Sequence, residues 1–108
     1  MGKIDASFVK DAEQHVRGLF IKELPEGLYY HTADHTSFVV NAIDRIGQDS
    51  GLDEHALNVA RVAGWFHDAG YVRSTDDHET ESRKMAEDFL RSKGVDEEDV
   101  KEVLHCID

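Results

Sequence analysis

The sequence predicts an all-α protein, a bundle of five helices forming one domain over residues 1–108. Two observations predict this class. Apolar residues recur every three or four positions in five separate segments, and no segment alternates with the period of two that a strand would show. The single proline and most of the glycines fall between these segments, where helices end. A chain of 108 residues is also long enough to bury one compact core.

The first helix is expected from Asp5 to about Lys22, where the segment ELPEG breaks it. Its apolar positions share one face because they lie three or four residues apart. They are Phe8, Ala12, Val16, Leu19 and Phe20.

The second helix is expected from about Thr32 to Gln48, with His35 on its apolar stripe. After it, Gly51 suits a helix C-cap and Asp53 suits the N-cap of the next helix. The stripe is predicted to consist of Phe38, Val39, Ala42, Ile43 and Ile46.

The third helix, about Glu54 to Ala69, is apolar on most sides after Leu57 and is predicted to be the central buried helix. The segment GYVRSTDD that follows is read as a loop. The fourth helix is expected near Asp77 to Lys93, and it ends at Gly94. Its inward residues are predicted to be Met85, Ala86, Phe89 and Leu90.

The fifth helix opens with Asp96 as its N-cap and continues to the last residue. Its apolar pattern, Val100, Val103, Leu104 and Ile107, stops without a C-cap. This pattern predicts that the chain is truncated at its C-terminus and represents the N-terminal part of a longer domain.

The single cysteine, Cys106, cannot form an internal disulfide, which suits a reducing compartment. It is read as a helix-face cysteine, with a nucleophile as the alternative.

The net charge is −11, from 23 acidic and 12 basic residues. This balance argues against binding to nucleic acid or to anionic membranes, because both need a basic surface. No apolar run reaches the roughly 20 residues of a membrane span, and no secretory signal is visible, so a cytoplasmic chain is expected. Because the chain is acidic, a substrate that carries phosphate would need a cation at the binding site to balance its negative charge.

The stretch GWFHDAG places His67 and Asp68 at the end of the most apolar helix. About one His-Asp pair is expected by chance in such a chain, so the pair is informative only through its surroundings. A buried carboxylate needs a partner or a metal. One reading is that His67 bonds to a backbone carbonyl while Asp68 faces solvent. The other is that both bind a divalent cation, which accepts these ligand types.

The stretch LYYHTADHTSFVV places His31 and His35 four residues apart, hence on one face of a helix that has begun by His31. These two histidines are either metal ligands or core residues that are hydrogen-bonded within the protein. If this helix packs against the one ending in His67-Asp68, two imidazoles and a carboxylate surround one point.

The segment YHTADHTSFVV followed by WFHDAGY resembles the HD-domain superfamily of metal-dependent phosphohydrolases, an all-α family named for its His and His-Asp metal ligands. The similarity covers roughly Leu28 to Leu90 and is strongest to small bacterial members with a Tyr-His-x-x-x-His opening. It implies that His35, His67 and Asp68 are metal ligands. It also implies that His31 donates a proton to the leaving-group oxygen.

The resemblance is less definite at two further positions. His78 falls where some members of the family place a histidine for a second metal. An ordinary helix start beside a surface pair of Glu79 and Arg83 is the alternative. The aspartate that serves as the fourth ligand in the family has no clear counterpart, because the family pattern runs past Asp108 before reaching it. The expectation is therefore a truncated protein or one that binds metal poorly.

The predicted function is hydrolysis of a phosphate ester or nucleotide by a metal-activated water that Asp68 helps to orient. These ligand types are compatible with Mn, Fe, Co, Ni or Zn, so the sequence does not identify the metal. A homodimer is possible from the sequence. Arg73, Arg83 and Lys84 are candidates to bind phosphate, with solvated helix charges as the alternative. A non-catalytic module that binds a nucleotide or a partner protein is the rival function. Oxidative chemistry at a di-iron site is a third possibility.

Overall fold

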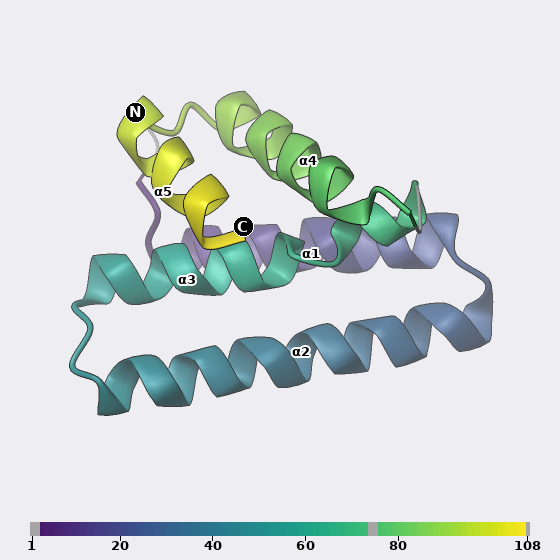
Figure 1. The fold of residues 1–108 in the computed structure, drawn as a ribbon, viewed down its shortest axis with the longest axis horizontal. Helices are drawn as coiled ribbons and strands as arrows, with labels where there is room; N and C mark the ends of the chain where they lie inside the picture. Colours follow the sequence, from purple (N-terminus) through teal and green to yellow (C-terminus); the bar gives the residue numbers. More distant parts are fainter. Residues whose placement is uncertain (1–2, 74–75, 108) are drawn as a thin grey trace.

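The computed structural model describes residues 3–73 and 76–107, and within them it contains five α-helices and no strand (Figure 1). The all-α, five-helix prediction is therefore confirmed. Ser74 and Thr75 of the predicted loop, and Asp108, lie outside the described residues. The helices are α1 (Ala6–Glu23), α2 (Glu26–Asp49), α3 (Glu54–Phe66), α4 (His78–Ser92) and α5 (Glu97–Ile107), with a short 3-10 helix η1 (Ala69–Val72).

Helix α3 is the centre of the molecule, as its composition predicts. It packs against α1, α2, α4 and α5, and Figure 1 shows α2 on one side of it and α4 and α5 on the other. Its second half, from Val62 to Phe66, is buried on every side. Large apolar side chains from the other helices complete the core, among them Phe20, Leu90 and Val100. Burial of this kind is the main force that stabilises the fold.

Helix α2 begins six residues earlier than predicted, at Glu26 instead of Thr32. Pro25 precedes it with a φ of −57°, and a proline at a helix start supplies a suitable φ without removing a needed hydrogen bond. As a result, the candidate site residues His31 and His35 lie one turn apart on the same continuous helix.

The predicted apolar stripe of α2 is partly wrong. Phe38 and Ile46 are 73% and 65% exposed, and Val39, Ala42 and Ile43 are only half-buried. The buried residues are Ala33, Thr36, Val40 and Gly47.

The reason for this difference is the close approach of α2 to α3. A Cβ atom on Gly64 would lie 3.1 Å from the Cγ2 of Val40 and 2.8 Å from the Cδ1 of Ile43. A Cβ on Gly47 would lie 2.6 Å from the Cδ1 of Leu57. Small residues on both helices permit this contact, and it turns the bulkiest α2 side chains outward.

Helix α3 ends at Phe66, three residues before the predicted end, and part of the predicted loop forms η1. Other boundaries agree with the sequence. Gly51 and Gly94 adopt the positive φ values, 76° and 72°, expected of C-capping glycines. Asp53 caps α3 by accepting a hydrogen bond from the amide of Ala56 at 2.7 Å. None of the described helices is long and apolar enough to cross a membrane.

Candidate metal centre

The His67-Asp68 pair lies in the turn between α3 and η1. His67 still has a helical backbone, whereas Asp68, with φ −111° and ψ 6°, has left it. Phe66 before the pair and Ala69 after it are completely buried. The turn is therefore held at both ends by the core, and its two polar side chains are themselves mostly buried.

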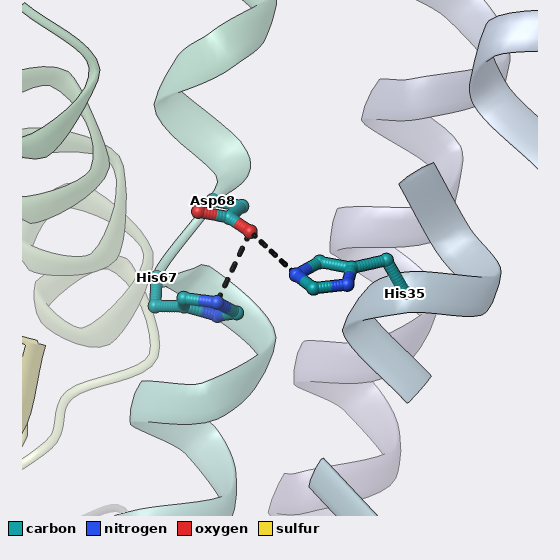
Figure 2. A group of neighbouring side chains, drawn as sticks. All are labelled: His35, His67 and Asp68. Atoms are coloured by element: carbon teal, nitrogen blue, oxygen red, sulfur yellow. Dashed lines mark ion pairs between the residues drawn. The ribbon is translucent and has the colours of Figure 1, made fainter. Parts of the chain in front are cut away.

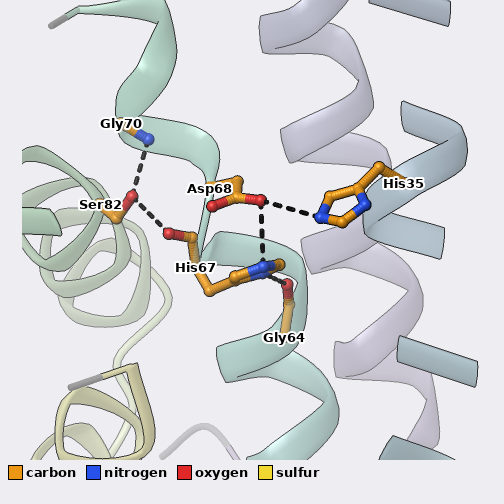
Figure 3. Close-up of polar contacts among 6 residues, drawn as sticks. All are labelled: His35, Gly64, His67, Asp68, Gly70 and Ser82. Carbon is orange, nitrogen blue, oxygen red and sulfur yellow. Dashed lines mark hydrogen bonds and ion pairs between the residues drawn. The ribbon is translucent and has the colours of Figure 1, made fainter. Parts of the chain in front are cut away.

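A single hydroxyl group on α4 connects the two ends of this turn (Figure 3). The Oγ of Ser82 accepts a hydrogen bond from the amide of Gly70 at 2.8 Å and donates one to the carbonyl of His67 at 3.0 Å. Ser82 is completely buried, so water cannot replace either bond. The hydroxyl fixes the backbone on both sides of Asp68.

Gly70 permits this arrangement because it has no side chain. A Cβ atom there would overlap the carbonyl oxygen of His78 and lie 2.6 Å from the amide nitrogen of Ser82. Both neighbours are backbone atoms of α4, which cannot move aside without displacing the helix. Glycine is thus the residue that lets η1 lie directly on the start of α4.

Three potential metal ligands converge beside the turn (Figure 2). The Oδ2 of Asp68 lies 3.1 Å from the Nε2 of His67 and 3.5 Å from the Nε2 of His35 on α2. One ligand atom from each residue falls within 4.8 Å of the other two. His35 is the most exposed of the three, so the group opens to solvent on the α2 side.

The donor set fits a divalent transition metal. The Nδ1 of His67 lies 2.6 Å from the carbonyl of Gly64, where it donates a hydrogen bond and leaves Nε2 facing Asp68. A ligating histidine normally bonds through its other nitrogen in this way, which fixes the ring and its tautomer. Two imidazole nitrogens and a carboxylate oxygen suit such metals, and three protein ligands leave positions for water or substrate.

A hollow of about 400 Å³ adjoins these ligands. His31, one turn before His35, belongs to its wall, and so does Tyr71 of η1. The full lining consists of Leu24, Leu28, His31, Thr32, His35, Asp68 and Tyr71. The candidate proton donor and two candidate ligands therefore face the same space.

Comparison with models of protein families identifies the family of this chain. A model of the HD domain matches residues 32–108, about 70% of the sequence. The chain belongs to the HD-domain family. Comparison with curated proteins and with solved structures gave no match. His35, His67 and Asp68 lie within the matched region. Because the match begins after Tyr30 and His31, it does not test the Tyr-His-x-x-x-His subgroup.

HD domains are generally metal-dependent hydrolases and typically bind divalent metals. In this HD domain the charges of His67 and Asp68 are coupled. The hydrogen bond to Asp68 raises the pKa of His67 above its ordinary value of 6.5, against the opposing effect of burial. The same bond, helped by the charges of His67, His35 and His78, lowers the pKa of Asp68 below 3.8.

These opposite shifts stabilise the metal-free fold in a limited pH window. The contribution of His67 is fully present below pH 6.5 and is lost as the pH rises through its raised pKa. The contribution of Asp68 is present above pH 3.8 and is lost as the pH falls through its lowered pKa. Between these values, a protonated His67 and an ionised Asp68 attract one another.

Metal binding should weaken as the solution is acidified. A proton on the Nε2 of His67 competes with the metal, so the apparent affinity is expected to fall by about tenfold per pH unit below the raised pKa of His67. Isothermal titration calorimetry with Mn²⁺ or Zn²⁺, in two buffers of different ionisation enthalpy, measures both the affinity and the protons released. An affinity independent of pH, with no proton release in this range, would contradict a role of His67 as ligand.

The remaining candidate residues are not members of the three-residue group. His78 is outside the three-residue group, and its ring stacks on Tyr71 at 4.1 Å between centroids. Arg73 lines a different hollow, together with His15 and Asp88. Arg83 and Lys84 are exposed on α4, and neither lines the hollow beside Asp68. Roles in phosphate binding for Arg73, Arg83 and Lys84 remain predictions.

A second group of acidic and histidine side chains lies at the opposite end of α3. His55 is 3.2 Å from Asp99 and 3.3 Å from Glu102, both on α5. His55 and Glu102 are about half exposed. Surface ion pairs between α3 and α5 explain this group without a metal.

Sequence reasoning missed Ser82. A signal was present, because Ser82, Ala86 and Phe89 follow one another at helical spacing on the inward face of α4. A serine in that row is a polar group at a core position, which needs hydrogen-bond partners. Which partners it finds is visible only in the structure.

Proposed function

We propose that this HD domain is a metal-dependent phosphohydrolase that hydrolyses a phosphate ester or nucleotide. The observation that supports it is the convergence of His35, His67 and Asp68 beside a hollow that also contains His31. This arrangement combines a cation site, an open space of ligand size and a nearby group that can donate a proton.

The residues divide the chemistry among them. A divalent metal held by His35, His67 and Asp68 would supply a Lewis acid and lower the pKa of a coordinated water from 15.7 to about 7. Asp68 carries two carboxylate oxygens, so that one can bind while the other accepts a hydrogen bond from the attacking water. His31 donates a proton to the departing oxygen from its place on the wall of the hollow.

The proposal is tested by metal analysis together with turnover of 4-nitrophenyl phosphate. We expect about one transition metal per chain and hydrolysis in the presence of Mn²⁺. Both should be lost when His67→Ala is combined with Asp68→Ala. The matched control combines His55→Ala with Asp99→Ala, which removes another His–Asp pair joined at similar distance, and it should retain both properties.

Two results would overturn the proposal. A double variant at His67 and Asp68 that keeps its metal would show that the ligands lie elsewhere. Metal binding in the wild-type chain without turnover of any phosphate ester would favour the rival function, a regulatory module that holds a phosphorylated ligand without hydrolysing it.

His31→Ala should separate binding from proton transfer. We expect kcat to fall by about 10²- to 10⁴-fold with an alkyl phosphate, because its alkoxide leaving group needs a proton. The loss should be much smaller with 4-nitrophenyl phosphate, whose leaving group is stable as an anion. Metal content should not change. Equal losses with both substrates would argue that His31 positions the substrate and does not transfer a proton.

A further inference from the structure

The hollow beside the candidate metal centre has mainly apolar walls. Its apolar lining consists of Leu24 at the end of α1, Leu28 in the first turn of α2 and Tyr71 of η1. Its polar lining consists of His31, Thr32, His35 and Asp68, of which His35 and Asp68 belong to the ligand group. The space therefore combines polar groups at the candidate metal centre with a larger apolar surface.

The aromatic member of this lining is supported by a second ring. The ring of Tyr71 stacks on the ring of His78 with an angle of 10° between their planes, so it presents a supported flat surface. Leu28 is 49% exposed although it is a large apolar residue. An exposed leucine and a supported aromatic ring in the lining of one hollow provide apolar surface that an apolar ligand would cover.

The walls also lack fixed positive charge. No lysine or arginine belongs to the lining of this hollow within residues 3–73 and 76–107, and the chain as a whole carries a net charge of −11. One phosphate group can be met by the metal and the histidines. Further phosphates placed against Leu24 and Leu28 would lose water without gaining a cation.

From these observations we infer the substrate class: a monophosphate ester with a compact apolar or aromatic organic group. This inference rests on the proposed function. The phosphate is placed at His35 and Asp68, and the organic group lies against Leu24, Leu28 and Tyr71. The volume of about 400 Å³ suits a ligand of this size. Nucleoside di- and triphosphates are expected to be poorer substrates, because no lysine or arginine of the lining is available to pair with their additional charges.

The first test compares ligands on the metal-loaded wild-type chain. Calorimetry should show that phenylphosphonate, which cannot be hydrolysed, binds about tenfold more tightly than methylphosphonate, since its ring buries apolar surface. Methylenebisphosphonate should bind more weakly than phenylphosphonate. In turnover, 1-naphthyl phosphate should exceed ATP in kcat/KM by tenfold or more, with AMP between them. Tighter binding of the bisphosphonate, or a preference for ATP, would overturn the inference.

The second test places a charge in the apolar wall. Leu28→Lys should weaken phenylphosphonate binding and raise the ratio of bisphosphonate to phenylphosphonate affinity by about tenfold. The control is Ile46→Lys, which adds the same charge to an exposed apolar position of α2 that does not line the hollow. If both variants shift the ratio equally, the effect is one of net charge and the inference fails.

The binding measurements distinguish this inference from the proposed function. Selective phenylphosphonate binding without any turnover would support the ligand class and reject hydrolysis. Turnover of phosphate esters without selectivity for an apolar group would support hydrolysis and reject the ligand class. Thermal unfolding of the Leu28→Lys chain checks that it remains folded.

Discussion

Gly70→Ala is expected to lower the free energy of unfolding by about 3 kcal/mol and to abolish high-affinity metal binding. The new Cβ would overlap the carbonyl oxygen of His78 and lie 2.6 Å from the amide of Ser82, both in the backbone of α4. Either α4 or η1 must therefore move. Both hydrogen bonds of the Ser82 hydroxyl depend on the present distance between α4 and η1. Asp68 would move with η1, away from the ligand position.

Two other glycines provide a graded control for this prediction. Gly18→Ala, within α1, meets no atom within 4 Å and should stabilise the chain by about 0.5–1 kcal/mol through helix propensity. Gly64→Ala should fall between them, because it meets the ends of the Ile43 and Val40 side chains, which can adjust. Urea unfolding of the three variants gives the order. A Gly70→Ala chain as stable as wild type would show that α4 and η1 are not locked together.

Ser82→Ala is expected to reduce metal affinity by about 10- to 100-fold, a size typical of groups that hold metal ligands in place. The substitution leaves the Gly70 amide and the His67 carbonyl without their buried partner. Unpaired buried groups of this kind cost about 1–3 kcal/mol each, so a loss of folding stability should accompany the loss of affinity. Ser82 touches no ligand atom and acts only by positioning the turn that carries His67 and Asp68.

Ser92→Ala is the matched control on the same helix. Its hydroxyl donates to the carbonyl of Phe89 at 2.7 Å, but the residue is exposed, so water can replace the bond. We expect changes within about 0.5 kcal/mol and no change in metal affinity. Calorimetric titration with the metal and urea unfolding measure both variants. Equal affinities for Ser82→Ala and wild type would remove Ser82 from any role in orienting the site.

The sequence predicted the elements that depend on local spacing. The apolar period placed α1, α3, α4 and α5 within about three residues of their observed bounds, and Asp53, Gly51 and Gly94 marked helix ends correctly. It also selected His35, His67 and Asp68 as one group, which the structure brings together. The helix boundaries are accessible from sequence because each depends on residues within a few turns of one another, whereas the ligand group joins two distant segments and was selected through their resemblance to the HD-domain superfamily.

What only the tertiary structure decided is which groups meet across different helices. It turned Phe38 and Ile46 outward, placed Arg73 in a separate hollow and made Ser82 the link between His67 and Gly70. The approach of two helices is set by the smallest residues at their contact, such as Gly64 against Val40 and Gly70 against α4. The members of each pair lie on different structural elements. Helical periodicity describes one face of one element and does not say how closely that face approaches its neighbour.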